Sequence, residues 1–192
     1  MKPDLDLLKQ MWQQKWPACP PVADDIKHFY EDKWLRMHSL PGGKRYPEND
    51  KEYSSLILRH QTILNEIKIS NTMTVILANW TNEHDGANVR WPEGYDMPKN
   101  LQYWQTIDES LEEDDEEFKS YCHLFVYQFE WQSGSLDRLF RYVAEDRLAG
   151  VIIAPEDLSW LYHPYDGGAD VFFSTIAKKD KLLNKYKNWA SN

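Results

Sequence analysis

The sequence predicts a single α+β domain whose central sheet of about five or six strands is packed by helices, with a mixed α/β fold as the alternative. Its 192 residues match the length of one large domain. Apolar residues recur at steps of three and four in some segments and at steps of two in others, as helices and strands require. The hydrophobic share of 42% and the charged share of 28% are typical of folded proteins.

The first third of the chain is expected to be mainly helical. Residues 5–16 have helical spacing after a cap at Asp4, and Pro17 ends that helix. A short helix from Val22 precedes a strand at residues 33–38. The clearest helix spans residues 49–68, because one stripe along it is formed by Tyr53, Leu56, Ile57, His60, Ile63, Leu64 and Ile67.

The rest of the chain supplies most of the predicted sheet. Strands are expected at residues 72–80, 101–107, 121–131, 150–154 and 169–173. The 121–131 strand is apolar on both faces, which predicts a central position. A helix capped by Ser133 or Ser135 joins it to the next strand, so one β-α-β unit is predicted. Residues 81–100 are expected to be a long loop or an insertion, and a last helix begins at Ser174.

The net charge of −9 comes almost entirely from one segment. Residues 108–117 hold eight acids and no base, which leaves 22 basic against 23 acidic residues elsewhere. Such a balance argues against nucleic-acid binding, which needs a basic face. This acidic loop is either solvated or a docking surface for a basic partner protein. The docking candidates are Glu112, Glu113, Asp114, Asp115, Glu116 and Glu117.

Cysteine content and hydropathy indicate the cellular compartment in which this protein is expected. Cys19 and Cys122 are too few for a disulfide framework and lack the paired spacing of a zinc site. The longest apolar stretches are far too short to cross a bilayer, and the first eight residues include acids where a signal peptide needs an apolar run. The sequence therefore predicts a cytoplasmic protein without a membrane association.

The most unusual motif lies between residues 160 and 170. His163 with Asp166 and Asp170 has the residue types of an acid-base or metal site, and Tyr165 lies among them. No second histidine stands at metal-ligand spacing, so no metal is predicted. The alternative is a hairpin turn in which Asp166 bonds to backbone amides.

A second cluster combines Arg36 and His38 on one strand face with Lys44 and Arg45 shortly after. Positive groups so arranged suit a carboxylate or a phosphate. The alternative is an exposed sheet face with salt bridges. If the fold brings Arg36 and His38 beside the Asp166 turn, the two clusters form one pocket.

Three classes of function remain. The favoured hypothesis is a non-catalytic protein that binds and neutralises a basic partner, because aromatic residues make up 14% of the chain and the acidic loop is concentrated. The alternative is a small-molecule enzyme or binder that uses both clusters. A structural or regulatory subunit is the third. No cofactor is predicted, since the sequence has no phosphate-binding loop and no dinucleotide fingerprint.

Several motifs together suggest a family. They are residues 34–41 (Trp-Leu-Arg-Met-His-Ser-Leu-Pro), 44–48 (Lys-Arg-Tyr-Pro-Glu), Arg59-His60 with Asn65-Glu66, 161–170 (Leu-Tyr-His-Pro-Tyr-Asp-Gly-Gly-Ala-Asp) and 189–191 (Trp-Ala-Ser). Across nearly its whole length, the chain resembles a bacterial family of uncharacterised proteins that share a domain of unknown function. Met37 and Gly42-Gly43 depart from the Phe and Glu-Ser usual there. The resemblance implies a bacterial, cytoplasmic protein and assigns no catalytic residue.

Overall fold

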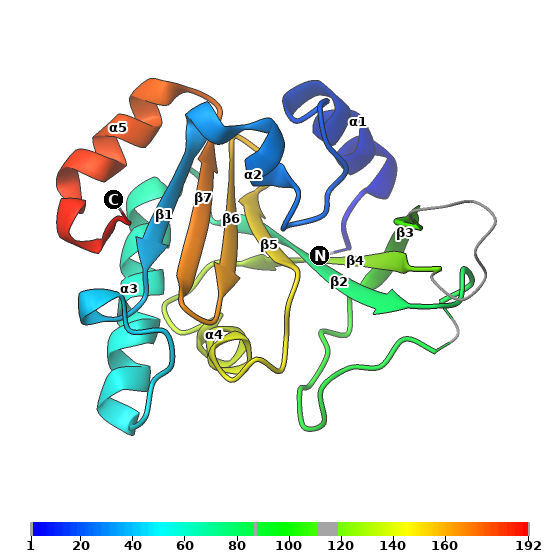
Figure 1. Ribbon diagram of the computed structural model, residues 1–192. Helices are drawn as coiled ribbons and strands as arrows, with labels where there is room; N and C mark the ends of the chain where they lie inside the picture. Colours follow the sequence, from blue (N-terminus) through cyan, green and yellow to red (C-terminus); the bar gives the residue numbers. More distant parts are fainter. Residues whose placement is uncertain (1, 87, 111–118, 192) are drawn as a thin grey trace.

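One seven-stranded sheet organises the computed structural model, which describes residues 2–86, 88–110 and 119–191 (Figure 1). Every neighbouring pair of strands is antiparallel, and the order across the sheet is β1-β7-β6-β5-β2-β4-β3. The strands are β1 (Trp34–His38), β2 (Thr72–Thr81), β3 (Gln102–Asp108), β4 (Tyr121–Glu130), β5 (Val151–Pro155), β6 (Trp160–Tyr165) and β7 (Gly168–Phe173).

Five α-helices accompany the sheet in the described residues: α1 (Leu5–Lys15), α2 (Ile26–Phe29), α3 (Asp50–Ile67), α4 (Asp137–Ala144) and α5 (Ile176–Lys185). Helix α3 begins where the Asn49 side chain accepts a hydrogen bond from the Glu52 amide, which satisfies a free donor of the first turn. Helix α4 begins after Leu136 without a side-chain cap, so neither Ser133 nor Ser135 has the predicted capping role.

The predicted count of five or six strands is wrong, and β6 is the strand that was missed. From the sequence, the stretch up to Gly168, with its two consecutive glycines, is expected to be rich in turns. In the structure β6 pairs with β7 from Trp160 to Tyr165, and the turn is confined to Asp166 and Gly167. Strand β6 joins β5 through one residue pair, Ile153 with Tyr162, so Pro164 lies outside that pairing and its missing N–H costs no hydrogen bond there.

The predicted β-α-β unit is also corrected. Strands β4 and β5 are joined by α4, but they are not neighbours, because β2 lies between them and pairs with both. The crossover therefore spans one strand, and the two strands run the same way only because each is antiparallel to β2. Helices combined with a wholly antiparallel sheet make this an α+β fold.

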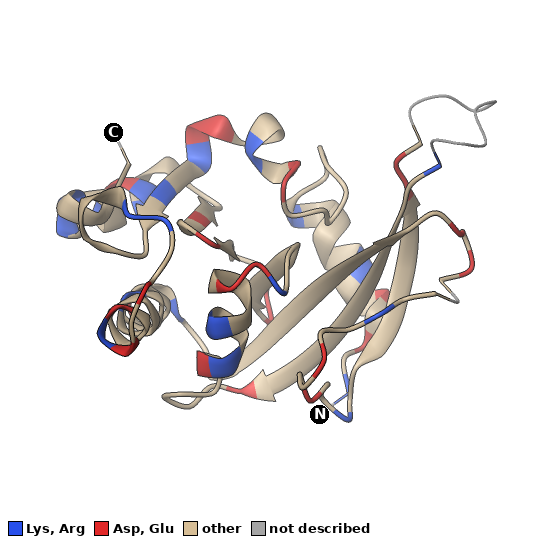
Figure 2. Ribbon diagram, turned by 60° about the horizontal axis from the view of Figure 1, so that its bottom comes forward, with Lys and Arg blue, Asp and Glu red and all other residues tan. Residues whose placement is uncertain are grey.

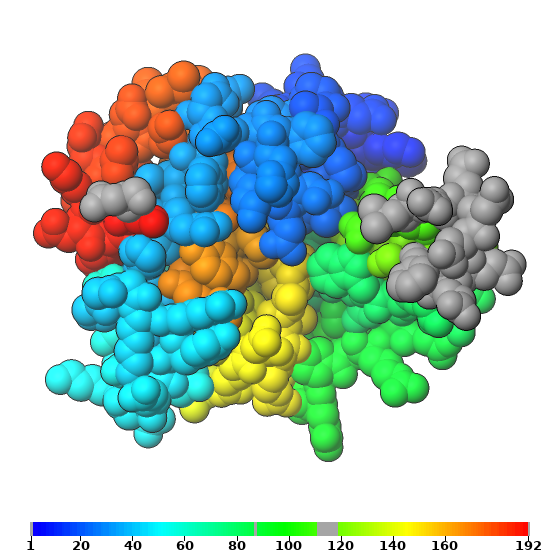
Figure 3. All heavy atoms as spheres, viewed as in Figure 1, coloured from blue at the N-terminus to red at the C-terminus, as the bar shows by residue number. Residues whose placement is uncertain are grey.

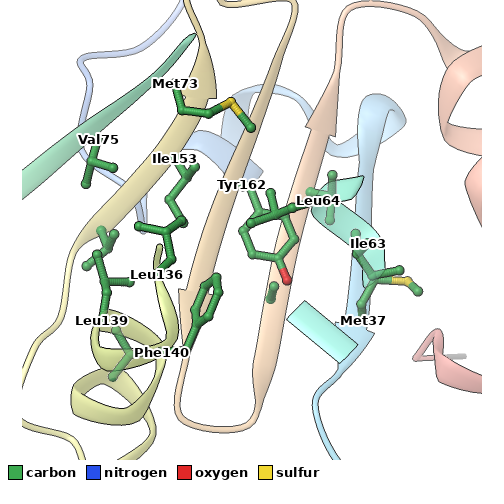
Figure 4. Packing of buried hydrophobic residues seen from close by; sticks show 14 of the residues in the cluster. Met37, Ile63, Leu64, Met73, Val75, Leu136, Leu139, Phe140, Ile153 and Tyr162 are labelled. Atoms are coloured by element: carbon green, nitrogen blue, oxygen red, sulfur yellow. The ribbon is translucent and has the colours of Figure 1, made fainter. Parts of the chain in front are cut away.

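The sheet is covered by helices on both faces. One core joins its strands to α3, α4 and α5, and Figure 4 shows part of it, with Leu64 and Phe140 directed towards Tyr162. The other core joins the opposite face to α1 and α2 through Trp12, Trp16 and Ile26. Charged residues lie mainly on helices and loops, and the long strands carry few (Figure 2). Both strand faces are therefore apolar, as a sheet between two layers requires.

The connection from β2 to β3 has no helix or strand among its described residues, but it packs on the core. The ring of Tyr95 lies 5.0 Å from that of Tyr142 in α4, and the ring of Trp91 lies 5.2 Å from that of Phe125. The carbonyl of Glu93 accepts a hydrogen bond of 2.6 Å from Arg147. Aromatic contacts of this kind add to the stability given by burial alone.

Two further findings concern the chain as a whole. Within the described residues, no helix combines the length and the apolar character needed to cross a bilayer. Residues 111–118 contain all six predicted docking residues, Glu112 to Glu117, and lie outside the described residues.

Candidate functional site

The two motifs singled out in the sequence meet at one edge of the sheet. Strands β6 and β7 form a hairpin that is closed by the pair Tyr165 and Gly168. Strand β1 pairs with the outer side of β7 and places Arg36 opposite Asp170. Because the chain between β1 and β6 builds the rest of the sheet, only the tertiary structure brings these residues together.

Arg36 and Asp170 form a two-point ion pair across the β1–β7 ladder. Arg36 Nε lies 2.8 Å from Asp170 Oδ1, and Nη2 lies 2.9 Å from Oδ2. The Asp170 side chain is only 4% exposed and that of Arg36 is 34% exposed. The hydrogen bonds to Asp170 raise the pKa of Arg36. The rings of Trp34 and Tyr165 lie 5.0 and 5.2 Å from the guanidinium carbon, so the group is held on its faces as well.

Arg45 and Asp166 form a second ion pair at the tip of the hairpin. Arg45 Nε lies 2.6 Å from Asp166 Oδ2, and this contact raises the pKa of Arg45. The Asp166 side chain is 8% exposed, whereas that of Arg45 is 65% exposed. Among the described residues, neither Arg36 Nη1 nor the two Nη atoms of Arg45 has a hydrogen-bond partner. Each guanidinium is therefore fixed by a buried carboxylate and keeps unused donors.

His163 is held by a backbone carbonyl. Its Nδ1 lies 2.8 Å from the carbonyl oxygen of Val151, which only accepts, so Nδ1 carries a proton. Its Nε2 lies 3.4 Å from Asp24 Oδ1. The hydrogen bond with His163 lowers the pKa of Asp24. The ring thus has a fixed orientation, with Nε2 directed to the carboxylate of Asp24.

These side chains line one cavity of about 660 Å³, within the range of small-molecule sites. Figure 3 shows orange atoms of the β6–β7 hairpin at the centre of this face, surrounded by blue, cyan and yellow segments. Five regions of the chain contribute to the lining: the segment from Asp24 into α2, β1 with the turn that follows it, the β6–β7 hairpin, the turn after α4, and Ser191. The charged and polar residues among them are Asp24, Lys27, Arg36, His38, Arg45, Asp146, His163, Tyr165, Asp166, Asp170 and Ser191.

A family comparison covers all five of these regions. The family model described as a domain of unknown function (DUF3885) matches residues 22–192. The chain belongs to this family. The matched range starts before α2 and leaves out α1. Searches of curated proteins and of solved structures found no match.

Seven of the eight ligand-binding candidates line the cavity of this DUF3885 protein, and Lys44 does not. Lys44 Nζ lies 2.8 Å from Glu52 Oε2 and 3.0 Å from Glu48 Oε2, where it ties the turn after β1 to the start of α3. Lys44 and Arg45 are adjacent in the chain, but Lys44 pairs with the start of α3 and Arg45 pairs with the β6–β7 hairpin. Alternation along an extended chain sends adjacent side chains to opposite sides.

Three charged residues of the cavity were not foreseen. Asp24 lies just before α2, Lys27 lies within α2, and Asp146 comes from the turn after α4. None of them belongs to a motif that stands out in the sequence. Asp146 has a φ of 56°, in the left-handed region that few residues other than glycine adopt, so a backbone turn directs it to the cavity.

The potential metal ligands of the DUF3885 protein are dispersed. Across residues 2–86, 88–110 and 119–191, no three His, Cys, Asp or Glu side chains are grouped closely enough to hold a metal ion. Three of the four cavity acids, Asp24, Asp166 and Asp170, instead pair with guanidinium or imidazole groups. The described cavity residues therefore offer ion pairing and hydrogen bonding to a ligand.

Proposed function

We propose that this DUF3885 protein binds a small ligand that carries a carboxylate or a phosphate group in the cavity between α2, β1 and the β6–β7 hairpin. The observation that carries the proposal is the pair of guanidinium groups, Arg36 and Arg45. Each is held through Nε by a buried carboxylate, and both line the same cavity with unused Nη donors.

Preorganisation supports this function. A guanidinium that is already fixed loses little rotamer freedom when a ligand binds, and its planar donors match a carboxylate or phosphate at two points. Lys27 adds a third positive group, and its Nζ has no hydrogen bond among the described residues. Asp24 and His163 add an acceptor and an imidazole for the rest of the ligand. Salt bridges that served only to hold the hairpin would not need a cavity around them.

The test is isothermal titration with inorganic phosphate and with succinate. The wild-type protein should bind at least one of them with a Kd of about 1 mM or lower. Arg45→Lys keeps a charge beside Asp166 but loses the planar pair of Nη donors, so it should weaken binding about tenfold or more. Because Arg45 is largely exposed, the variant should unfold at nearly the same urea concentration as the wild type.

Arg138→Lys is the matched control, because Arg138 pairs with Asp96 outside this cavity. It should bind the probes as the wild type does. Absence of binding to both probes at about 10 mM, or equal binding by Arg45→Lys and the wild type, would refute the proposal.

A basic partner protein is the second candidate function. A groove of about 530 Å³ beside the β3–β4 hairpin is lined by Asp24, Asp25, Asp108 and Glu109, and no Lys or Arg is among its lining residues. Burial and the charges of Asp25 and Asp24 raise the pKa of Glu109, so these acids repel one another. A cationic partner would relieve that repulsion.

The test of this second function is affinity capture from the native host at low and moderate salt. The wild type is compared with a variant in which Asp25, Asp108 and Glu109 of the groove and the acids from Glu112 to Glu117 are neutralised. A basic protein that binds the wild type directly and is lost from the variant would support partner binding. If the variant keeps every partner, this function is rejected.

A reducing compartment, the cytoplasm, is proposed as the site of action. Cys19 and Cys122 are both free and buried, as thiols of proteins in reducing compartments commonly are. Cell fractionation with the untagged chain would test it.

A further inference from the structure

A second cavity is lined by the end of α3, by α5, and by Trp160 of β6 and Phe173 of β7. Its volume is about 170 Å³. It shares no lining residue with the cavity of the proposed function, so a ligand bound in it would be independent of that function. Apolar side chains form much of its wall: Ile67, Ile69, Trp160, Phe173 and Leu182.

Trp160 leaves a donor unused in this region. Its side chain is 1% exposed, yet its Nε1–H has no hydrogen-bond partner among the described residues. An unsatisfied buried donor costs about 1–3 kcal/mol, and most such donors in proteins are paired. Trp160 lines the cavity, but its Nε1 is fully buried, so a ligand placed there would contact the indole ring and not the N–H.

Lysine side chains give the same cavity a positive charge. Lys68, Lys178 and Lys181 line it, and none has a hydrogen bond or ion pair through Nζ with a described residue. Glu66 is the one acid among the lining residues, and its Oε2 already lies 2.6 Å from Lys185 Nζ. The net charge presented to a ligand is therefore positive.

We infer that this cavity binds a small apolar carboxylate, either an aromatic acid or a short-chain fatty acid. The carboxylate balances the charge of the lysines, while the hydrocarbon part contacts Ile69, Phe173 and Leu182. A dry cavity of about 150 Å³ is known to hold benzene, so a volume of about 170 Å³ suits one ring or a short chain.

The experiment is a titration with benzoate followed by the indole N–H signals in a ¹H–¹⁵N NMR spectrum. The chain has nine Trp residues, so eight other indole signals serve as internal controls. The Trp160 signal is assigned by its loss in Trp160→Phe. If that variant does not fold, contacts from Phe173 and Leu182 protons assign the signal in the wild type.

Benzoate should shift the Trp160 signal in a saturable way, with a Kd on the order of 0.1–1 mM. The double variant Lys178→Gln with Lys181→Gln should weaken benzoate binding several-fold, whereas Lys187→Gln, outside the cavity, should not. Benzyl alcohol has a similar size without the charge and should bind more weakly than benzoate to the wild type.

Two results would overturn the inference. One is a Trp160 signal that does not move with benzoate up to about 50 mM. The other is equal binding of benzoate and benzyl alcohol, or of benzoate by the wild type and the double lysine variant, because the ligand class would then not be a carboxylate.

Discussion

Replacing Gly168 with alanine should separate β1 from β7 and disrupt the candidate site. A Cβ built on Gly168 would lie 2.0 Å from the carbonyl oxygen of Met37 and 3.2 Å from Cα of His38. Both neighbours are backbone atoms, so no rotamer change can relieve the overlap. Strand β1 must move, and the Arg36–Asp170 ion pair lies two residues further along the same ladder.

The size of the effect is set by two contributions. Forced overpacking costs about 1–3 kcal/mol, and each lost ladder hydrogen bond costs about 1 kcal/mol. With one or two bonds lost, the Gly168→Ala variant should be about 2–5 kcal/mol less stable than the wild type. That is a large share of the stability of about 5–15 kcal/mol typical of folded domains.

Urea unfolding followed by tryptophan fluorescence measures this difference. Gly167→Ala is the matched control, because the nearest atoms to its Cβ are Arg45 Cγ and Tyr165 Cε2, both at 3.3 Å and both in side chains. The Gly167→Ala variant should be less stable than the wild type by less than about 1 kcal/mol. If Gly168→Ala unfolds within about 1 kcal/mol of the wild type, the close approach of β1 and β7 is refuted.

Three further predictions concern the buried core. Burial lowers the pKa of His60 from 6.5 to about 3, so as pH falls from 6.5 the unfolded chain gains a proton that the folded chain does not. Unfolding free energy should drop by up to about 1.4 kcal/mol per pH unit in that window, and urea curves of His60→Gln should lack this slope. Burial raises the pKa of Cys19 and Cys122 to about 12, so a disulfide reagent should label neither thiol before denaturation; rapid labelling of the native protein would contradict this. Phe140→Ala removes a fully buried ring that stacks 4.4 Å from His60, and calorimetry should show a loss of about 3–5 kcal/mol, whereas a loss below about 1 kcal/mol would contradict that packing.

Local sequence patterns were sufficient to predict those elements whose structure depends on residues close together in the chain. The stripe from Tyr53 to Ile67 placed α3 within one residue at each end. The alternation in β4 separated Tyr127 from Val126, and the structure puts them in different cores. Both signals depend on backbone geometry over a few residues, which the sequence states directly.

The hairpin at residues 160–173 shows a local signal that was misinterpreted. Asp166-Gly167 between two apolar runs is a common sign of a two-residue hairpin turn, and β6 could have been inferred from it. Pro164 is compatible with β6, because proline is tolerated where its N–H is not needed for pairing. Only the pairing of β6 with β5 and β7 shows that an N–H at residue 164 is not needed for a hydrogen bond.

The sequence by itself determined which residue types are available: two arginines, two histidines and two aspartates in two short motifs, with a concentrated acidic segment elsewhere. The tertiary structure decided that β1 pairs with β7, that Arg36 meets Asp170 and Arg45 meets Asp166, and that Lys44 turns to Glu52 instead. Strand pairing joins residues more than a hundred positions apart. Its free energy depends on the packing of the whole sheet, so no local pattern encodes which strands become neighbours.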